Sequence, residues 1–238
     1  MTRASGPGWR SMQGLAWLAR VGASPADTWA AAMNWGPSTL RSHTLRLERD
    51  GLLARMARAQ GQGGPLLYAT ALGVQAAGVD AGGYRKPPAP VSFGHLVACA
   101  EMAAYLTQRG REMIAPRELM VDSRWVGQLE WTEHGETRRR GHRPDFVATV
   151  AGGRSLAIEV ELTAKSPDRL RSVLALYVEW LESERVDSVL YVVGGDRERR
   201  QLVREAPNLG LEPGRRFGVQ LLSEVRARLS NARENLAA

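Results

Sequence analysis

Along the first eighty residues, apolar positions recur at helical spacing and are separated by turn signals. The pattern predicts three helices, over residues 11–20, from residue 24, and over 38–50. The sequence NWGPS forms the turn before the third helix, in which Leu40, Thr44 and Leu47 share one face. Two short apolar runs around a glycine-rich tip then predict a β-hairpin. This order of elements is typical of a winged helix-turn-helix domain, which we predict over residues 1–81.

Arginine and serine side chains occupy the outer face of the third helix and the first strand of the hairpin. Such a face on a lone helix is typical of a solvated surface, but the hairpin that follows favours contact with double-stranded DNA. In these domains helix side chains enter the major groove, while arginines also bind phosphates. The predicted DNA-binding residues are Ser38, Arg41, Ser42, Arg46, Arg49, Arg55 and Arg58.

The sequence GGYRKPPAP, residues 82–90, cannot continue a helix or a central strand and is predicted to be a linker. After it, strands and helices alternate. The expected elements are a helix over 92–109, a strand near 126–132, two strands and a tight turn within 144–162, a helix from 166, strands over 187–193 and in FGVQLL, a helix from about 196 and a closing helix. The predicted fold class is therefore α/β, with a second, mixed-sheet domain over residues 91–238.

The strand IEVEL places Glu159 and Glu161 on one face, because side chains alternate across a strand. A three-residue loop over 152–154 would put the apolar positions of both strands on a common core face. Asp145 would then lie opposite Glu161 and diagonal to Glu159. Three carboxylates so placed repel one another unless a cation such as Mg²⁺, which prefers oxygen ligands, lies among them. A solvated strand face balanced by nearby arginines is the alternative, and the spacing alone does not decide between them.

Lys165 adds a second kind of charge close to these carboxylates. The chain has 32 basic residues, of which only Lys86 and Lys165 are lysines. A compact ammonium can approach a water or a scissile phosphate as a point charge, which a guanidinium does differently. The sequence therefore indicates a role for Lys165 beside Glu161, and the alternative is a surface lysine near a helix start.

Charge and composition narrow the classes of partner. The net charge is +7, and residues 1–85 hold nine arginines against four acidic residues, which favours a polyanionic partner. The chain shows neither a long apolar run nor a secretory signal, so we expect a cytoplasmic protein without a membrane partner. Its single cysteine, Cys99, is expected to be a buried apolar residue. We expect His95 and His142 to be packing or surface residues, with His142 the better functional candidate because it stands beside RPD.

The sequence RPDF at 143–146, followed by EVELTAKSPDRL at 159–170, resembles the PD-(D/E)xK nuclease superfamily. That superfamily has the core order helix, three strands, helix, strand, and in this chain Glu161 stands where its motif has lysine. The resemblance implies Asp145 and Glu159 as metal ligands, with Mg²⁺ as the cofactor. It further implies that Glu161 is a ligand or water-positioning base and that Lys165 stabilises the transition state. Glu101 or Glu118 would add a ligand from the first helix of the domain or the segment after it.

The whole layout resembles the replication-relaxation family of bacterial plasmids and integrated mobile elements. The sequences that carry this resemblance are LERDGLL, YATALG, HLVACAEMAAYL, PRELM, RPD and EVELTAKSP. It implies a DNA-associated role in plasmid replication or transfer. The protein partners that we expect are a second copy of the chain or other replication and transfer proteins of a mobile element. Three interpretations stay open: a Mg²⁺-dependent DNA endonuclease or nickase, a non-catalytic DNA-binding regulator of replication, transfer or transcription, and a structural component of a mobile-element machine.

Overall fold

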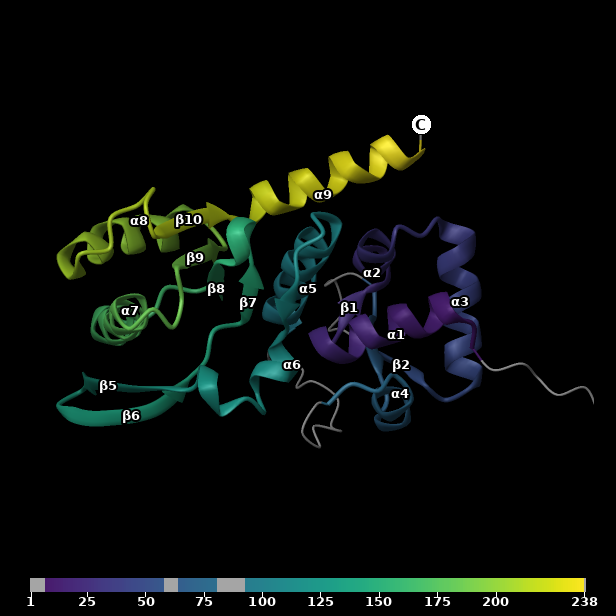
Figure 1. Cartoon of the computed structure of the whole chain (residues 1–238), viewed down its shortest axis with the longest axis horizontal. Coiled ribbons are helices and arrows are strands. Elements are labelled where there is room, and N and C mark those ends of the chain that lie inside the picture. Colours follow the sequence, from purple (N-terminus) through teal and green to yellow (C-terminus); the bar gives the residue numbers. More distant parts are fainter. Residues whose placement is uncertain (1–6, 58–63, 81–92, 238) are drawn as a thin grey trace, which may run out of the picture.

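The structure is a computed structural model that describes residues 7–57, 64–80 and 93–237. It is a mixed α/β protein in which a mostly helical part and a sheet-containing part lie side by side (Figure 1). None of the helices in the described ranges is long and apolar enough to cross a membrane.

The first part contains the three predicted helices and the predicted hairpin. Its elements are α1 (Trp9–Val21), β1 (Ser24–Pro25), α2 (Ala26–Met33), α3 (Pro37–Arg49), β2 (Leu53–Met56), β3 (Leu66–Ala69) and α4 (Ala71–Ala76). Pro37 stands at the first position of α3, where its missing N–H costs no hydrogen bond. The residues expected to begin the second helix form β1 instead, which pairs antiparallel with β3. The hairpin tip, including Arg58, lies outside the described residues.

The second part is built around a five-stranded mixed sheet of order β10-β9-β8-β7-β4. Its elements are α5 (Phe93–Gln108), β4 (Met113–Ile114), α6 (Pro116–Leu119), β7 (Phe146–Thr149), β8 (Ser155–Glu161), α7 (Pro167–Glu182), β9 (Ser188–Val193), α8 (Asp196–Glu205), β10 (Phe217–Leu221) and α9 (Leu222–Ala237). Strands β8, β9 and β10 run parallel, while β7 and β4 are antiparallel to their neighbours. The mixed sheet expected from the sequence is therefore confirmed.

Helices cover both faces of this sheet. On one face Ile158 and Val160 of β8 join a buried cluster with residues of α5 and α9, and on the other Ala157 joins a cluster with α7 and α8. Because side chains alternate along β8, Glu159 and Glu161 point to the same side as Ala157, toward α7. Both glutamates are therefore directed into the protein and not into solvent.

A two-stranded ribbon, β5 (Gly127–Glu133) paired with β6 (Glu136–His142), lies beside α7. Leu129 of β5 is buried in the cluster around α7, and the guanidinium of Arg169 lies 5.7 Å from the ring centre of Trp131. The strand β5 was expected, but β6 was not. Its three successive arginines at 138–140 have no apolar alternation, and pairing with β5 is what makes the segment a strand.

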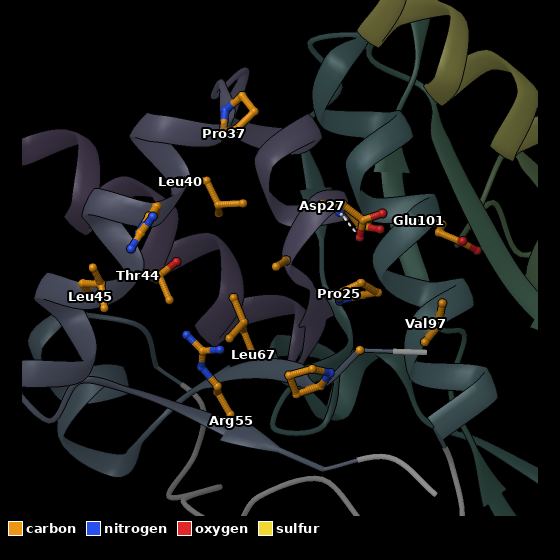
Figure 2. A pocket seen from close by; sticks show the side chains of 15 residues that line it. Pro25, Asp27, Pro37, Leu40, Thr44, Leu45, Arg55, Leu67, Val97 and Glu101 are labelled. Atoms are coloured by element: carbon orange, nitrogen blue, oxygen red, sulfur yellow. Dashed lines mark hydrogen bonds between the residues drawn. The ribbon is translucent and has the colours of Figure 1, made fainter. Parts of the chain in front are cut away.

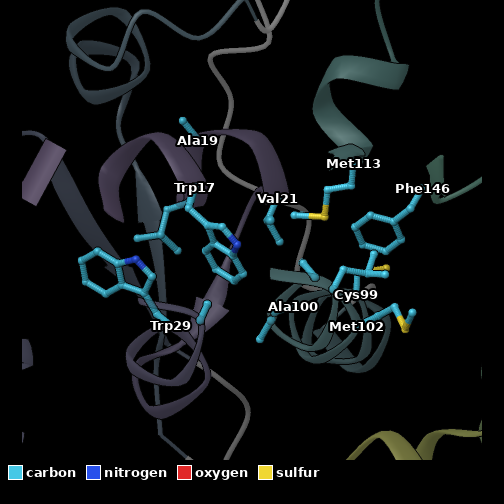
Figure 3. Packing of buried hydrophobic residues seen from close by; sticks show 14 of the residues in the cluster. Trp17, Ala19, Val21, Trp29, Cys99, Ala100, Met102, Met113 and Phe146 are labelled. Carbon is cyan, nitrogen blue, oxygen red and sulfur yellow. The ribbon is translucent and has the colours of Figure 1, made fainter. Parts of the chain in front are cut away.

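Residues on both sides of the predicted linker share one buried cluster (Figure 3). Trp17, Val21 and Trp29 of the first part belong to the same cluster as Cys99 of α5 and Phe146 of β7. Two polar contacts reinforce this packing, from Trp17 Nε1 to Thr107 Oγ1 at 3.0 Å and from Arg20 Nε to Glu118 Oε1 at 2.8 Å. The predicted linker itself, residues 82–90, lies outside the described residues.

The predicted register of the β7–β8 hairpin is wrong by one step of pairing. Thr149 pairs with Ser155, and the Val150 N–H donates to the Arg154 carbonyl at 2.8 Å, so the loop is 151–153 and not 152–154. The physical reason is that Gly152 and Gly153 both adopt positive φ, 78° and 74°, and the chain therefore turns one residue earlier. The same register, extended by one residue, brings Asp145 level with Glu159 and not with Glu161.

Candidate functional site

Asp145 stands just before β7, between β8 and the first turns of α5. Its Oδ2 accepts a hydrogen bond from the Val160 N–H at 2.7 Å, and its Oδ1 lies 3.0 Å from Nε2 of His95. This hydrogen bond is the largest influence on the imidazole and raises the pKa of His95 above its ordinary value. The carboxylate is thus fixed from two sides, by the backbone of the sheet and by a helix.

Glu159 is the most enclosed carboxylate of the group, with 5% of its surface exposed. It lies 2.8 Å from Nε2 of His142 and accepts a short hydrogen bond from the hydroxyl of Tyr177 on α7. Burial alone would raise the pKa of Glu159, but His142, Lys165 and Tyr177 together lower it below its ordinary value. These three contacts therefore favour the ionised form of Glu159.

Glu161 and Lys165 form an ion pair at the end of β8. The Lys165 side chain is 14% exposed, and burial lowers its pKa even though Glu159 and Asp145 act in the opposite direction. The ammonium therefore lies within electrostatic reach of all three predicted carboxylates. The structure brings Asp145, Glu159, Glu161 and Lys165 to one end of β8, but each carboxylate has its own partner.

His95, His142 and Tyr177 contact these carboxylates but were not expected to do so from the sequence. The histidines had been assigned to packing or the surface; the neighbouring RPD marked His142 as the better candidate, whereas no local signal marked His95. Glu101 and Glu118, the additional ligands implied by the resemblance, are engaged elsewhere. Glu101 contacts Arg226 at 3.0 Å, and Glu118 contacts Arg20 and caps the Ala115 N–H.

Within the described residues, the donor atoms that converge closely enough to hold one metal ion belong to His95, Cys99 and Asp145. These atoms are a nitrogen, a sulfur and an oxygen, whereas Mg²⁺ is bound by oxygen ligands in octahedral geometry. This donor set does not fit Mg²⁺. Of the carboxylates that could complete an all-oxygen site, Glu159 contacts Tyr177 and His142 through Oε1, and Glu161 contacts Lys165 through Oε2.

A cleft of about 330 Å³ opens onto Asp145 and His142 from the side of β6 and α6. Arg140, Arg143 and Arg169 also line it. Three guanidinium groups around a carboxylate-containing cleft favour a ligand with several anionic oxygens, because arginine binds phosphate with paired N–H donors.

The outer face of α3 carries the other group of predicted functional residues. Ser38, Arg41, Ser42, Arg46 and Arg49 are all exposed there, around the exposed Leu45. Arg49 pairs with Asp50 at 3.1 Å, and Arg55 on β2 pairs with Glu48 at 2.5 Å. In the described part of the chain, Arg41 and Arg46 form no ion pair with a carboxylate.

A groove of about 730 Å³ runs along the inner edge of α3 toward α5 (Figure 2). Arg55 lies on one side, and Asp27 and Glu101 lie at the other. Arg41 also lines the groove. Its charge is therefore mixed. Ser42, Arg46 and Arg49 do not line this groove.

No family model matches this chain, and no curated protein matches it. The predicted resemblance to the replication-relaxation family thus stays a prediction. Among solved structures, the chain is similar to the crystal structure of protein VC1899 from Vibrio cholerae, at 11% identity and a TM-score of 0.34. The similarity covers 98% of this chain and 58% of that one, so the chain spans a little over half of that protein's length. A likeness at this level carries no argument about function.

Proposed function

We propose that this chain is a double-stranded DNA-binding protein whose first part is a winged helix-turn-helix domain. The observation that carries the proposal is the exposed face of α3, where Arg41 and Arg46 have no carboxylate partner in the described chain. The order α1-β1-α2-α3-β2-β3, with β3 between β1 and β2, supports it, because this is the order in which such domains place a recognition helix before a hairpin wing.

The physical basis is charge. DNA presents a dense row of phosphates, and each arginine that neutralises one releases a condensed counterion. Arg41 and Arg46 can do this without breaking an ion pair to any of the described residues. Arg49 and Arg55 would have to exchange Asp50 and Glu48 for phosphate, so they contribute less per residue.

The test compares two double variants with the same change in charge. Arg41→Ala/Arg46→Ala removes two exposed charges from α3, while Arg199→Ala/Arg200→Ala removes two from α8. We expect the first to weaken duplex binding and to lower the slope of log affinity against log salt by about two, since each phosphate contact accounts for roughly 0.9. The α8 variant should keep the slope of the unchanged chain. Equal losses in both variants would show that net charge, and not α3, drives binding.

A second candidate function is hydrolysis of a phosphodiester at the end of β8. It is favoured by the electrostatic proximity of Lys165 to Asp145 and Glu159, and by the arginine-lined cleft that opens onto Asp145. The order α5-β4-β7-β8-α7-β9 supports the PD-(D/E)xK resemblance, with β5 and β6 inserted between its first two strands. A divalent cation, when bound, would supply an activated water. The chain's own part is to bind phosphate through arginine and to place the Lys165 ammonium beside the reacting group.

Cleavage is tested on supercoiled and linear DNA with Mg²⁺ or Mn²⁺, at protein concentrations that saturate binding. We expect metal-dependent nicking or cutting that is lost in both Asp145→Asn and Glu159→Gln, which keep the size of the side chains. Duplex binding by these variants should be unchanged, because Asp145 stands just before β7 and Glu159 stands on β8, and both strands lie apart from α3 (Figure 1). Tight binding without cleavage by the unchanged chain would instead support the non-catalytic regulator of replication, transfer or transcription.

A further inference from the structure

We infer that His95, Cys99 and Asp145 form a binding site for a divalent cation of the zinc class. The inference shares Asp145 with the proposed cleavage site, but it concerns metal binding alone, and the two can fail separately. It goes beyond the sequence-based expectation of an all-carboxylate magnesium site.

The donor atoms of the three side chains lie at distances that suit one shared ion. Nε2 of His95 lies 3.0 Å from Oδ1 of Asp145 and 3.4 Å from Sγ of Cys99, and the three donor atoms all lie within 4.8 Å of one another. In a tetrahedral zinc site, bonds of about 2.0 to 2.3 Å place neighbouring ligand atoms roughly 3.3 to 3.7 Å apart. Two of the three ligand separations are therefore already close to those of a zinc site before any ion is added.

The fold holds the three side chains from a helix and from the edge of a strand. His95 and Cys99 stand one turn apart on α5 and so share a face of that helix. Asp145 approaches from the sheet, and its second oxygen is fixed by the Val160 N–H, which orients the free oxygen toward the histidine. Two rigid elements thus position the donors, and no loop has to close around the ion.

The chemistry of the donor atoms and their exposure to solvent also suit a metal of the zinc class. Sulfur and imidazole nitrogen select zinc and related transition metals, whereas Mg²⁺ is held by oxygen. Cys99 is 3% exposed, while the side chains of Asp145 and His95 are 20% and 40% exposed. The buried thiol closes one side, and the other side is open for a water or a substrate atom. Three protein ligands with an open fourth position are typical of catalytic zinc sites and not of structural ones.

Co²⁺ is the probe for this site, added to the full chain under reducing conditions. Because Cys99 is the single cysteine of the chain, a thiolate-to-cobalt charge-transfer band can come only from this residue. We expect one Co²⁺ per chain with that band, displacement by Zn²⁺, and no displacement by about a hundredfold excess of Mg²⁺. Binding releases the thiol proton, since the thiolate is the form that binds the metal.

Three variants locate the site. Cys99→Ala, which suits its alanine-rich helix, should remove the charge-transfer band, and His95→Gln should weaken Co²⁺ binding by at least about tenfold while the thiol is kept. His134→Asn removes an exposed histidine from the β5–β6 turn and should change neither. Circular dichroism of each variant confirms that it is folded.

The outcomes separate this inference from the proposed function. Saturating Co²⁺ without a thiolate band, or a band that Mg²⁺ competes away, overturns the zinc-class site. If Mg²⁺-dependent DNA cleavage appears with no Co²⁺–thiolate band, cleavage stands and this inference falls. If the band appears and depends on Cys99 and His95 while DNA is never cut, the metal site stands and the proposed hydrolysis falls.

Discussion

The outer face of α3 and the end of β8 both gather charged side chains, but they do so in opposite environments. On α3 the arginines are exposed, and Arg41 and Arg46 have no carboxylate partner among the described residues. On β8, Glu159 and Glu161 are 5% and 9% exposed, and each is bonded to a neighbouring side chain. A charge in water needs no partner, whereas a buried charge is tolerated only when it is paired. The arginines on α3 can therefore contact a ligand directly, whereas the glutamates on β8 already contact side chains inside the protein.

The largest difference in the free energy of unfolding should appear between two variants that each lose one charged side chain, one from β8 and one from α3. Glu159→Ala leaves the Tyr177 hydroxyl and His142 without their carboxylate in a buried place, and we expect it to lower the free energy of unfolding by about 3 kcal/mol. Arg46→Ala should change it by less than about 0.5 kcal/mol, because its side chain is exposed. Urea unfolding of the two variants measures both values.

Equal losses of unfolding free energy in these two variants would contradict the difference that we describe between the exposed charges of α3 and the buried charges of β8. A Glu159→Ala protein more stable than the unchanged chain would show that repulsion from Asp145 and Glu161 outweighs the contacts to Tyr177 and His142.

An intermediate loss of stability is expected when the hydroxyl of Tyr177, which donates to Glu159, is removed. Tyr177 and Tyr191 are both fully buried, but only Tyr177 donates to a carboxylate, while the Tyr191 hydroxyl has no hydrogen-bond partner within the described residues. We expect Tyr177→Phe to cost about 2 kcal/mol and Tyr191→Phe to be neutral or stabilising, since it removes an unpaired buried hydroxyl. Thermal and urea unfolding of the pair check this, and similar costs for both would contradict it.

The smallest effect concerns Glu205, a buried carboxylate outside the β8 group. Arg171 Nε lies 2.8 Å from it and Arg204 contacts its other oxygen, and these hydrogen bonds lower the pKa of Glu205. A lowered pKa in the folded state adds stability above the unfolded pKa and loses it as the pH falls through the folded value. Glu205→Gln should therefore cost about 1 kcal/mol at pH 7, and the difference should begin to shrink as the pH falls below about 4.3, the ordinary carboxyl pKa, and continue to shrink toward the lowered folded pKa.

Urea unfolding between pH 7 and pH 3 gives this profile. A constant difference across that range would show that the contribution of Glu205 comes from packing and not from its charge. In that case Glu205 would not be a buried carboxylate that stabilises the fold through its ion pairs.

Local patterns in the sequence were sufficient for most of the regular elements. The face of α3 follows from helical spacing, and Leu47 is fully buried as that spacing requires. The pairing of Phe146 with Ile158 keeps the predicted common core face of the hairpin. The residue opposite Asp145 was predicted wrongly because either of two loop placements keeps the alternation of apolar side chains. The φ angles of two glycines decide between these placements.

The residues around Asp145 could not be found from local patterns. His95 lies fifty positions before Asp145 in the chain, and only the packing of α5 on the sheet brings them together. Tyr177 likewise reaches Glu159 from α7 across the opposite face. The sequence identified the residues with reactive chemistry on one hairpin, but the partners that set their charge come from other elements.

Helices α1 and α2 share one buried cluster with α5 and the sheet, and this packing sets the separation between the outer face of α3 and the cleft at Asp145. Because α5 contacts both α2 and β8, it connects the part of the protein that carries α3 to the part that carries Asp145. A long ligand that touched both would be gripped at two points whose spacing is dictated by the protein and not by the ligand.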